Sequence, residues 1–224
     1  GKEPEADVGG PGTSGNKIAE IIDTDAGDTG ELRYKLSDAD APLAAGRVEV
    51  AIKRLDDDLG NGDAFITLFN SDTNNSGSIL DFRIKDDSFG VRYPSSTDTS
   101  AVSVLLDTWM DVVITWEYPG GDTAVAPEVI IEVDGVALPA ITPDNSPFGG
   151  VTHVSFRFGD NSGVREATGI FSVDDLAIYS DTAGTAEVFS DDFESYLEGD
   201  SLDTDNAASP YNSSTSEATV GVEE

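Results

Sequence analysis

The sequence predicts an all-β protein built as an antiparallel β-sandwich. Two patterns predict it: short runs in which apolar and polar residues alternate, and clusters of Asp, Asn, Gly, Ser and Pro that separate these runs at the spacing of hairpins. A third observation agrees, because no segment of ten residues shows the period of a helix. The 224 residues suit one large β domain or two small ones.

The alternating runs place the strands in chain order. Strands are expected at residues 17–22, 31–36, 47–54, 64–69, 79–85, 89–93, 101–106, 109–117, 128–134, 136–141, 151–158, 170–179, 188–196 and 216–222. Because every second side chain of a strand points to the same face, each run identifies its own core residues. The clearest sets are Leu32, Tyr34 and Leu36; Leu80, Phe82 and Ile84; Val112, Ile114 and Trp116; and Val154, Phe156 and Phe158.

The net charge excludes two classes of partner. The chain has 12 Lys and Arg against 44 Asp and Glu, a formal charge of −32. Nucleic-acid phosphates and anionic membrane surfaces both repel such a polyanion, so we expect neither as a partner. No apolar run approaches the ~18 residues that cross a bilayer, and the first residues are acidic, unlike a signal peptide. We therefore expect a soluble, mature chain.

Residue types that are scarce also limit the chemistry. The chain has no cysteine, which excludes disulfides and thiolate sites. His153 is the only histidine, so a Ser-His-Asp triad would depend on this one ring. Residues 1–16 are mostly Gly, Pro and acidic residues, and they predict a flexible lead with little packing. Residues 17–224 are expected to form a single module.

Four segments together carry a family resemblance: Gly30-Glu31-Leu32-Arg33-Tyr34-Lys35-Leu36, Trp109-Met110-Asp111-Val112-Val113-Ile114-Thr115-Trp116, Phe156-Arg157-Phe158-Gly159-Asp160-Asn161, and Phe171-Ser172-Val173-Asp174-Asp175-Leu176-Ala177-Ile178-Tyr179. In this order they resemble the concanavalin-A-like, laminin-G-like jelly-roll modules appended to polysaccharide-degrading enzymes of marine bacteria. The resemblance covers about residues 17–180. It implies a jelly-roll sandwich, secreted or on the cell surface, that binds carbohydrate.

The order of the strands is permuted relative to that family. Residues 188–196 resemble the strand that usually comes first, yet here they follow the strand that usually comes last. We expect residues 188–224 to fold back into the same sandwich, because free chain ends that lie close together can be relocated at modest cost. The chain would then be a monomer or one unit of a multidomain chain. The alternative is a swapped strand that completes a neighbouring copy.

Basic residues recur between apolar neighbours on three predicted strands. Alternation puts Arg33 with Lys35, and Arg83 with Lys85, on the faces away from the core, and Arg157 follows the same pattern. If these strands are neighbours, they form a cationic platform that suits an acidic polysaccharide such as alginate or pectate, because the arginine fork pairs with carboxylates. Trp109, Tyr93 and His153 are further candidate ligand contacts. The alternative is that the cations neutralise Glu31, Asp81 and Asp160.

The resemblance also implies a calcium site. In such modules the strands that correspond to residues 170–179 and 188–196 supply ligands to a structural calcium, an ion that takes six to eight oxygens. Here these strands carry Asp174, Asp175, Asp191, Asp192 and Glu194. The alternative is an acidic, solvated edge without metal.

The predicted function is a non-catalytic carbohydrate-binding module that recognises an acidic polysaccharide and targets an attached enzyme to it. Catalysis is not expected, because the sequence lacks Glu-x-Asp-x-x-Glu, Gln-Ile-His and the paired Tyr/His/Arg strand motif of sandwich glycosidases and lyases. The alternative is a calcium-stabilised structural or adhesive repeat of a bacterial surface protein.

Overall fold

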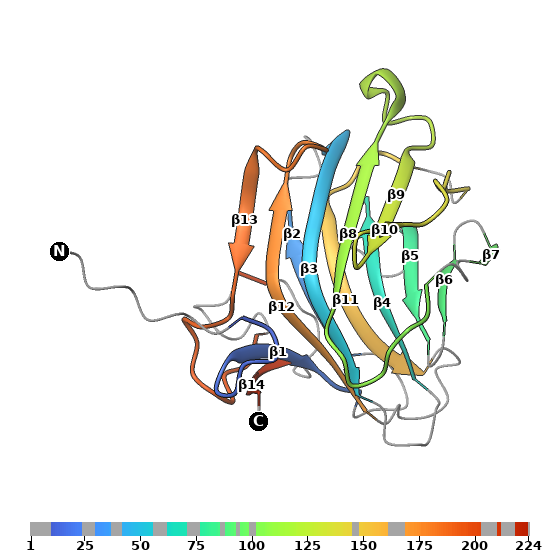
Figure 1. Cartoon of the computed structure of the whole chain (residues 1–224). Coiled ribbons are helices and arrows are strands. Elements are labelled where there is room, and N and C mark those ends of the chain that lie inside the picture. The colour runs from blue at the N-terminus through green and yellow to red at the C-terminus, as the bar shows by residue number, and fades with distance from the viewer. Residues whose placement is uncertain are drawn as a thin grey trace.

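The computed structural model describes residues 10–23, 30–36, 42–55, 62–70, 77–85, 88–92, 95–98, 102–144, 148–160, 169–202, 210–211 and 218–223. Two antiparallel sheets pack face to face (Figure 1). The strands are β1 (Lys17–Ile21), β2 (Gly30–Lys35), β3 (Ala45–Leu55), β4 (Gly62–Phe69), β5 (Ser78–Ile84), β6 (Phe89–Arg92), β7 (Ser95–Asp98), β8 (Met110–Glu117), β9 (Glu128–Val133), β10 (Val136–Ala137), β11 (His153–Asp160), β12 (Ile170–Tyr179), β13 (Glu187–Asp191) and β14 (Ala218–Val222). The predicted fold class, an antiparallel β-sandwich of the jelly-roll type, is confirmed.

The larger sheet has eight strands in the order β10-β9-β8-β3-β12-β1-β14, and β13 also pairs with β12. The smaller sheet has six strands in the order β2-β11-β4-β5-β6-β7. The one helical element described is a short 3-10 turn, Pro119–Gly121. None of the described residues forms a helix with the length and apolar character that a membrane crossing requires.

The core lies between the sheets, on the faces that alternation predicts. In the smaller sheet, one row of paired residues crosses five strands: Leu32, Phe156, Ile66, Phe82 and Val91. All five are buried, and the first four are fully so. Such a continuous apolar row fixes the register of the strands, because a slip by one residue would turn every side chain to the other face.

The larger sheet contributes the opposite wall of the core. Val112, Ile114 and Trp116 of β8 are fully buried, as predicted. The indole of Trp116 lies directly over Gly46 of β3, where a Cβ atom would come within 2.2 Å of the ring. Glycine is therefore required at position 46.

Strand β12 divides the larger sheet into two branches. Its first half pairs with β1 and its second half pairs with β13, on the same side of β12. The register of its pairing with β3 shifts between Asp174 and Ala177, and Asp175 within this bulge has a φ of 46°. The branches separate at the bulge, as the positions of β1 and β13 show in Figure 1.

Both C-terminal strands pair within the same chain. β13 lies against β12, and β14 lies against β1 in the register Lys17↔Val222. Within the expected lead, residues 1–9 lie outside the described residues, whereas residues 10–16 form turns. Asn16 is only 3% exposed, so the end of this lead is packed, contrary to the expectation of little packing.

Several strand predictions were wrong. Residues 102–106 form no strand, and Leu105 and Leu106 are exposed. The backbone N–H that bonds to β3 is that of the next residue, Asp107, which donates to the carbonyl of Arg54. The strand expected at 136–141 is only two residues long. β13 ends at Asp191, because Phe193 has a φ of 57° and starts a turn. β7 was missed, since its Ser-Ser-Thr-Asp sequence contains no apolar residue.

Candidate functional site

The outer face of the smaller sheet gathers the predicted basic residues. Alternation turns Leu32, Phe156, Ile66, Phe82 and Val91 toward the core, so their neighbours along each strand point outward. We call this surface the arginine face; its side chains are Glu31, Arg33, Lys35, Asp63, Phe65, Thr67, Phe69, Asp81, Arg83, Lys85, Arg92, His153, Ser155 and Arg157. Six of the chain's 12 basic residues therefore lie on one face of one sheet, and three carboxylates, Glu31, Asp63 and Asp81, lie among them.

The arginines lie beside two phenylalanines of β4. Phe65 pairs with Arg157 of β11 on one side and with Arg83 of β5 on the other. Their guanidinium carbons lie 5.8 and 5.7 Å from the centre of the Phe65 ring. Arg33 lies over Phe69, with 4.3 Å between the guanidinium carbon and the ring centre. The ring faces attract the cations and fix the positions of the three guanidinium groups.

Glu31 organises the centre of the arginine face. Its Oε1 accepts hydrogen bonds from Nε and Nη2 of Arg33, at 2.9 and 2.6 Å, and from Oγ of Ser155 at 2.5 Å. All three residues are buried. The predicted neutralisation of Arg33 by Glu31 is therefore present, and this pair is a charge-assisted contact within the protein.

His153 is positioned by its neighbour in the chain. Thr152 Oγ1 donates to the carbonyl of Phe69 at 3.3 Å and lies 2.9 Å from Nδ1 of His153. The hydroxyl can donate to Nδ1 or accept a hydrogen bond from Nδ1–H, according to the tautomer of the ring. In either case Thr152 fixes the orientation of the imidazole through Nδ1.

Two further cations of the face, Arg83 and Arg92, have acidic neighbours. Arg83 Nη2 pairs with Oδ2 of Asp63, and Arg92 Nη1 lies 3.3 Å from Oδ2 of Asp81. Oδ1 of Asp81 accepts hydrogen bonds from Thr67 Oγ1 at 2.9 Å and from a serine hydroxyl of β5 at 2.7 Å. Each carboxylate thus holds a guanidinium group in place.

Exposure differs along the arginine face. His153, Arg33 and Arg157 are 3, 6 and 7% exposed. Lys35 is exposed, and the side chains of Arg83 and Arg92 are 22% and 41% exposed. His153, a candidate ligand contact, is therefore among the least accessible residues of the face, because alternation tells which side of a sheet a residue occupies but not how deeply it is buried there.

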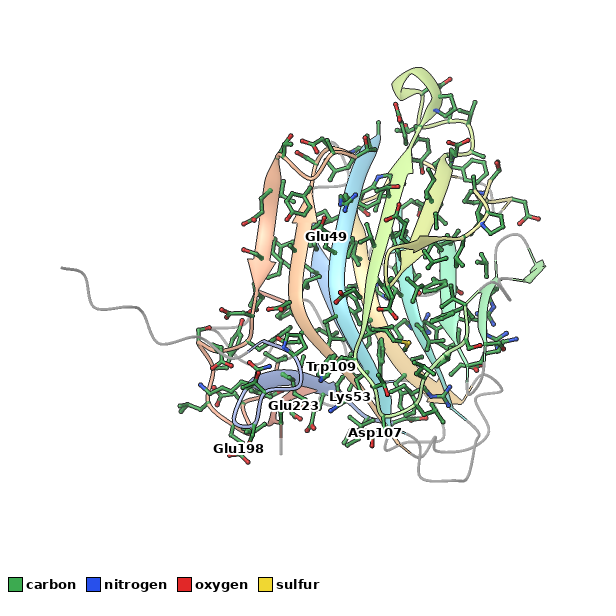
Figure 2. The ribbon with its side chains drawn as sticks, viewed as in Figure 1. Glu49, Lys53, Asp107, Trp109, Glu198 and Glu223 are labelled. Carbon is green, nitrogen blue, oxygen red and sulfur yellow. The ribbon has the colours of Figure 1, made fainter. Side chains whose placement is uncertain are left out.

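Two other candidates lie elsewhere. Tyr93 is outside the described residues. Trp109 precedes β8, in the larger sheet, and its Nε1 donates to Oε1 of Glu223 at 3.1 Å. The ammonium group of Lys53 pairs with the same oxygen and lies 5.0 Å from the centre of the Trp109 ring (Figure 2). Trp109 therefore links the C-terminal residues to the larger sheet and is not on the arginine face.

The predicted calcium ligands lie where β12 and β13 meet. A cavity of about 440 Å³ opens beside the bulge and is lined by Asp175, Leu176, Ala177, Ser190, Asp191, Asp192 and Ser195. Burial, together with repulsion from Asp192 and Asp111, raises the pKa of Asp175. Burial raises the pKa of Asp174 to about 7, against the hydrogen bonds from Asn16 and the Asp175 backbone.

The five carboxylates do not converge on one point. Asp191 Oδ2 accepts hydrogen bonds from the hydroxyls of Tyr196 and Tyr211, both at 2.9 Å, and its Oδ1 accepts from Phe193 N. Oε1 of Glu194 accepts from Lys17 N. Within the part of the chain that the structure describes, no three acidic or histidine side chains are grouped closely enough to hold a metal ion. The set of five thus does not fit calcium as it stands, and calcium stays a prediction.

Sequence reasoning missed several residues of the arginine face. It gave no role to Ser155, to the phenylalanines Phe65 and Phe69, or to Thr152 beside the face. The signal for the two phenylalanines was the alternation in β4, where Phe65, Thr67 and Phe69 share the face opposite Ala64, Ile66 and Leu68. Because large apolar side chains occupy both faces of β4, the outward phenylalanines read as part of a buried strand.

Comparisons with solved structures find proteins of similar fold at low sequence identity. A carbohydrate esterase from the Shiga toxin-encoding bacteriophage phi24B is 14% identical, with a TM-score of 0.48 over 79% of this chain and 85% of that one. A SAP-like pentraxin from Limulus polyphemus is 15% identical, with a TM-score of 0.43 over 74% and 76%. An alginate lyase from Corynebacterium sp. is 10% identical, with a TM-score of 0.40 over 65% and 60%. No protein-family model matches the sequence, and no curated protein matches it.

These comparisons correct one prediction. The sequence led us to exclude catalysis, yet four of the similar structures are alginate lyases and another is a carbohydrate esterase. The exclusion depended on missing signatures of particular enzyme families, and these five proteins are only 9 to 15% identical to the chain. The exclusion of catalysis is therefore withdrawn.

Proposed function

We propose that the chain binds an acidic polysaccharide of the alginate or pectate type at the arginine face. The observation that carries this proposal is the placement of six of 12 basic residues on one sheet face of a protein whose net charge is −32. Exposed ion pairs contribute little to the free energy of folding, so stability alone does not explain why these cations lie together. Concentrating them on one surface creates a local positive region, which attracts anionic groups.

The chemistry of the face suits carboxylates. A guanidinium group presents two parallel N–H donors to a planar carboxylate, and a lysine supplies a point charge. The stacking of Arg33 on Phe69, and of Arg83 and Arg157 beside Phe65, restricts these side chains before a ligand arrives. Less conformational entropy is then lost on binding.

His153 favours a second function, the cleavage of the same polymer. Its ring is held through Nδ1 by the hydroxyl of Thr152, and in the tautomer that carries the proton on Nδ1 the other nitrogen, Nε2, would accept a proton. In an elimination, this nitrogen would take the proton from the ring carbon next to the uronate carboxylate, the electron pair would form a carbon–carbon double bond, and the glycosidic oxygen would leave with a proton from water. Arg33 and Lys35, on the neighbouring strand, would neutralise the charge that develops on the carboxylate.

Calcium belongs to the proposal as a separate expectation. Asp175 and Asp192 line the cavity beside the β12 bulge, and their mutual repulsion is the arrangement that a divalent cation relieves. Of the five expected ligands, Asp191 and Glu194 already accept hydrogen bonds within the protein. A calcium ion here would depend on Asp175 and Asp192 and on water. Secretion or display on the cell surface stays an expectation from the family resemblance.

Affinity electrophoresis of the full chain tests the binding proposal. Gels that contain alginate, pectate, a sulfated galactan or a neutral glucan are run at equal ionic strength. Retardation by alginate or pectate, and not by the neutral glucan, supports the proposal. If no acidic polymer retards the protein, the alternative of a structural or adhesive unit is favoured.

A separate assay tests cleavage. It follows the release of unsaturated uronates by their ultraviolet absorbance, and His153→Ala should abolish this release.

A further inference from the structure

Lys53 of β3 and Glu223, the last residue that the structure describes, are held in contact. The ammonium group of Lys53 pairs with Oε1 of Glu223, and their side chains are only 12% and 9% exposed. Backbone hydrogen bonds fix Glu223 from two sides, because its N–H donates to the carbonyl of Asn16 and its carbonyl accepts from the N–H of Gly15. An amine and a carboxyl group therefore meet at a fixed place, largely out of water.

The indole of Trp109 borders this pair. Its Nε1–H donates to the same oxygen, Oε1 of Glu223, at 3.1 Å, and the ammonium group of Lys53 lies 5.0 Å from the centre of the ring (Figure 2). A donor on Oε1 stabilises negative charge that develops on that oxygen when a nucleophile adds to the carboxyl carbon. The indole is thus placed to assist an attack by the nitrogen of Lys53.

A second carboxyl group, that of Glu20, interacts with both members of the pair. Glu20 is on β1, and its carboxyl lies directly over Gly221 of β14, where a Cβ atom would come within 2.2 Å of Cδ. Glycine at position 221 therefore makes room for it. Burial raises the pKa of Glu20, the charge of Lys53 lowers it, and the charges of Glu223 and Glu198 raise it. Glu20 can accordingly exchange a proton with the reacting groups.

We propose that Lys53 and Glu223 condense to form an amide bond between Nζ and Cδ, which links β3 covalently to the end of β14. One ammonium proton passes to Oε2 of Glu223, and the freed lone pair attacks Cδ, while Oε1, held by Trp109, carries the negative charge. A second proton leaves the nitrogen for Glu20, which donates it to the Oε2 hydroxyl. One water departs, the carbonyl re-forms, and Glu20 is again ionised.

Two features favour the amide over the ion pair. Taking an ammonium group and a carboxylate out of water costs free energy that their attraction only partly returns, whereas an amide carries no charge. Groups that are held in contact also react at effective concentrations of ~10⁵–10⁸ M, far above the concentration of the water that opposes condensation.

The bond would act as a staple in a chain that has no cysteine. It joins residues that are 170 positions apart. A cross-link of this span restricts the unfolded chain, as a disulfide does. This inference goes beyond the proposed binding function and does not depend on it.

Mass spectrometry of the full chain tests the bond. The amide lowers the intact mass by about 18 Da, the mass of one water. Trypsin does not cleave after an acylated lysine, so residues 48–54 should stay joined to residues 166–224, a stretch without Lys or Arg. This branched peptide distinguishes the proposed bond from loss of water at another site.

Variants assign the roles. Lys53→Arg and Glu223→Ala should each have the full calculated mass and give no branched peptide. Glu20→Gln should slow formation of the bond about 100-fold or more. Arg47→Gln, which removes a partly exposed cation paired with Glu49, is the matched control and should retain the bond.

The wild type decides the proposal without reference to any variant. If it has its full calculated mass and yields no branched peptide, both when purified and after prolonged warming, the proposal is overturned. If the wild type carries the bond and Glu20→Gln forms it equally fast, the bond stands and the proton transfer assigned to Glu20 is wrong.

Discussion

The side-chain amide of Asn16 donates a 2.6 Å hydrogen bond to Oδ2 of Asp174, and it joins two residues that are 158 positions apart. Both side chains are buried. The contact fixes the first described turn of the chain against the bulge of β12, where the larger sheet divides. Because Asp174 is buried at this junction, its state of protonation affects the free energy of unfolding.

Asp174 makes the protein less stable as the pH rises toward neutrality. Burial raises its pKa to about 7 in the folded protein, whereas an unfolded aspartate titrates near 3.9. Between these values the folded state binds more protons than the unfolded state, so the free energy of unfolding falls as the pH rises from about 4 to 7. Asp174→Asn should abolish this fall, which is on the order of 4 kcal/mol between pH 4 and pH 8 for a pKa difference of about three units. Urea unfolding from pH 4 to pH 8 measures it, and parallel curves for the two proteins would contradict the prediction.

Glu31 holds together the centre of the arginine face. Glu31→Ala leaves Arg33 buried without its carboxylate and should cost about 3–5 kcal/mol of the free energy of unfolding. Ser155→Ala removes one of the three hydrogen bonds to Glu31 and should cost about 1–2 kcal/mol. Denaturant titration of both variants compares their free energies of unfolding. Arg47→Gln is the control, because it removes a partly exposed cation that pairs with Glu49. Equal costs for Glu31→Ala and Ser155→Ala would show that the charge of Arg33 is compensated elsewhere.

The C-terminal residues are held through Glu223. Its carboxylate pairs with Lys53 and accepts a hydrogen bond from the indole of Trp109, and these three labelled side chains lie together at one end of the larger sheet (Figure 2). Glu223→Ala should expose Trp109, shift its fluorescence to longer wavelength, and speed amide exchange in β1 and β14. Trp109→Phe in the same background removes the fluorescence change, because Trp116 is fully buried. Unchanged amide exchange in β14 would contradict this role of Glu223, because the pairing of β14 with β1 would then be sufficient to hold the strand in place.

The calcium site predicted beside the β12 bulge can be tested through the melting temperature. Any rise that calcium produces should depend on the residues that line the cavity. Asp175→Asn should abolish any rise in melting temperature that calcium produces. Asp191→Asn should lower the melting temperature with and without calcium, because this carboxylate accepts hydrogen bonds from two tyrosine hydroxyls. Melting curves with calcium and with chelator separate the two effects. If chelator changes neither the wild type nor Asp175→Asn, the calcium prediction is wrong.

Alternation along the strands predicted the fold and the faces, because it depends on each strand alone. Leu32, Phe82, Phe156 and Trp116 are all core residues, as their runs indicated. The run at 101–106 has the same kind of signal, yet Leu105 and Leu106 are exposed. A run of apolar residues becomes a strand only where a neighbouring strand offers its hydrogen-bonding edge, and the sequence does not show which edges are already paired.

The candidate site could be predicted only in part for a related reason. The pattern placed Arg33, Arg83 and Arg157 on faces away from the core, and the order of strands β2, β11, β4 and β5 turned these into one surface. It could not predict that Arg33 and His153 are buried, because alternation assigns a residue to one side of a sheet and carries no information on what packs against that side. The sequence pattern also could not predict that some of the five acidic residues already accept hydrogen bonds within the protein. Asp191, for example, accepts one from Tyr211, which lies twenty positions further along the chain.

The most direct test of acidic-polysaccharide binding is titration calorimetry of the full chain with alginate and pectate across a range of salt concentrations. Long-range repulsion between a −32 protein and a polyanion is screened over ~8 Å at physiological ionic strength. The account predicts saturable binding to one of the acidic polymers that strengthens from low to moderate salt, and no binding to a neutral glucan. Absence of heat with every acidic polymer at all salt concentrations, or equal binding to the neutral glucan, would contradict it.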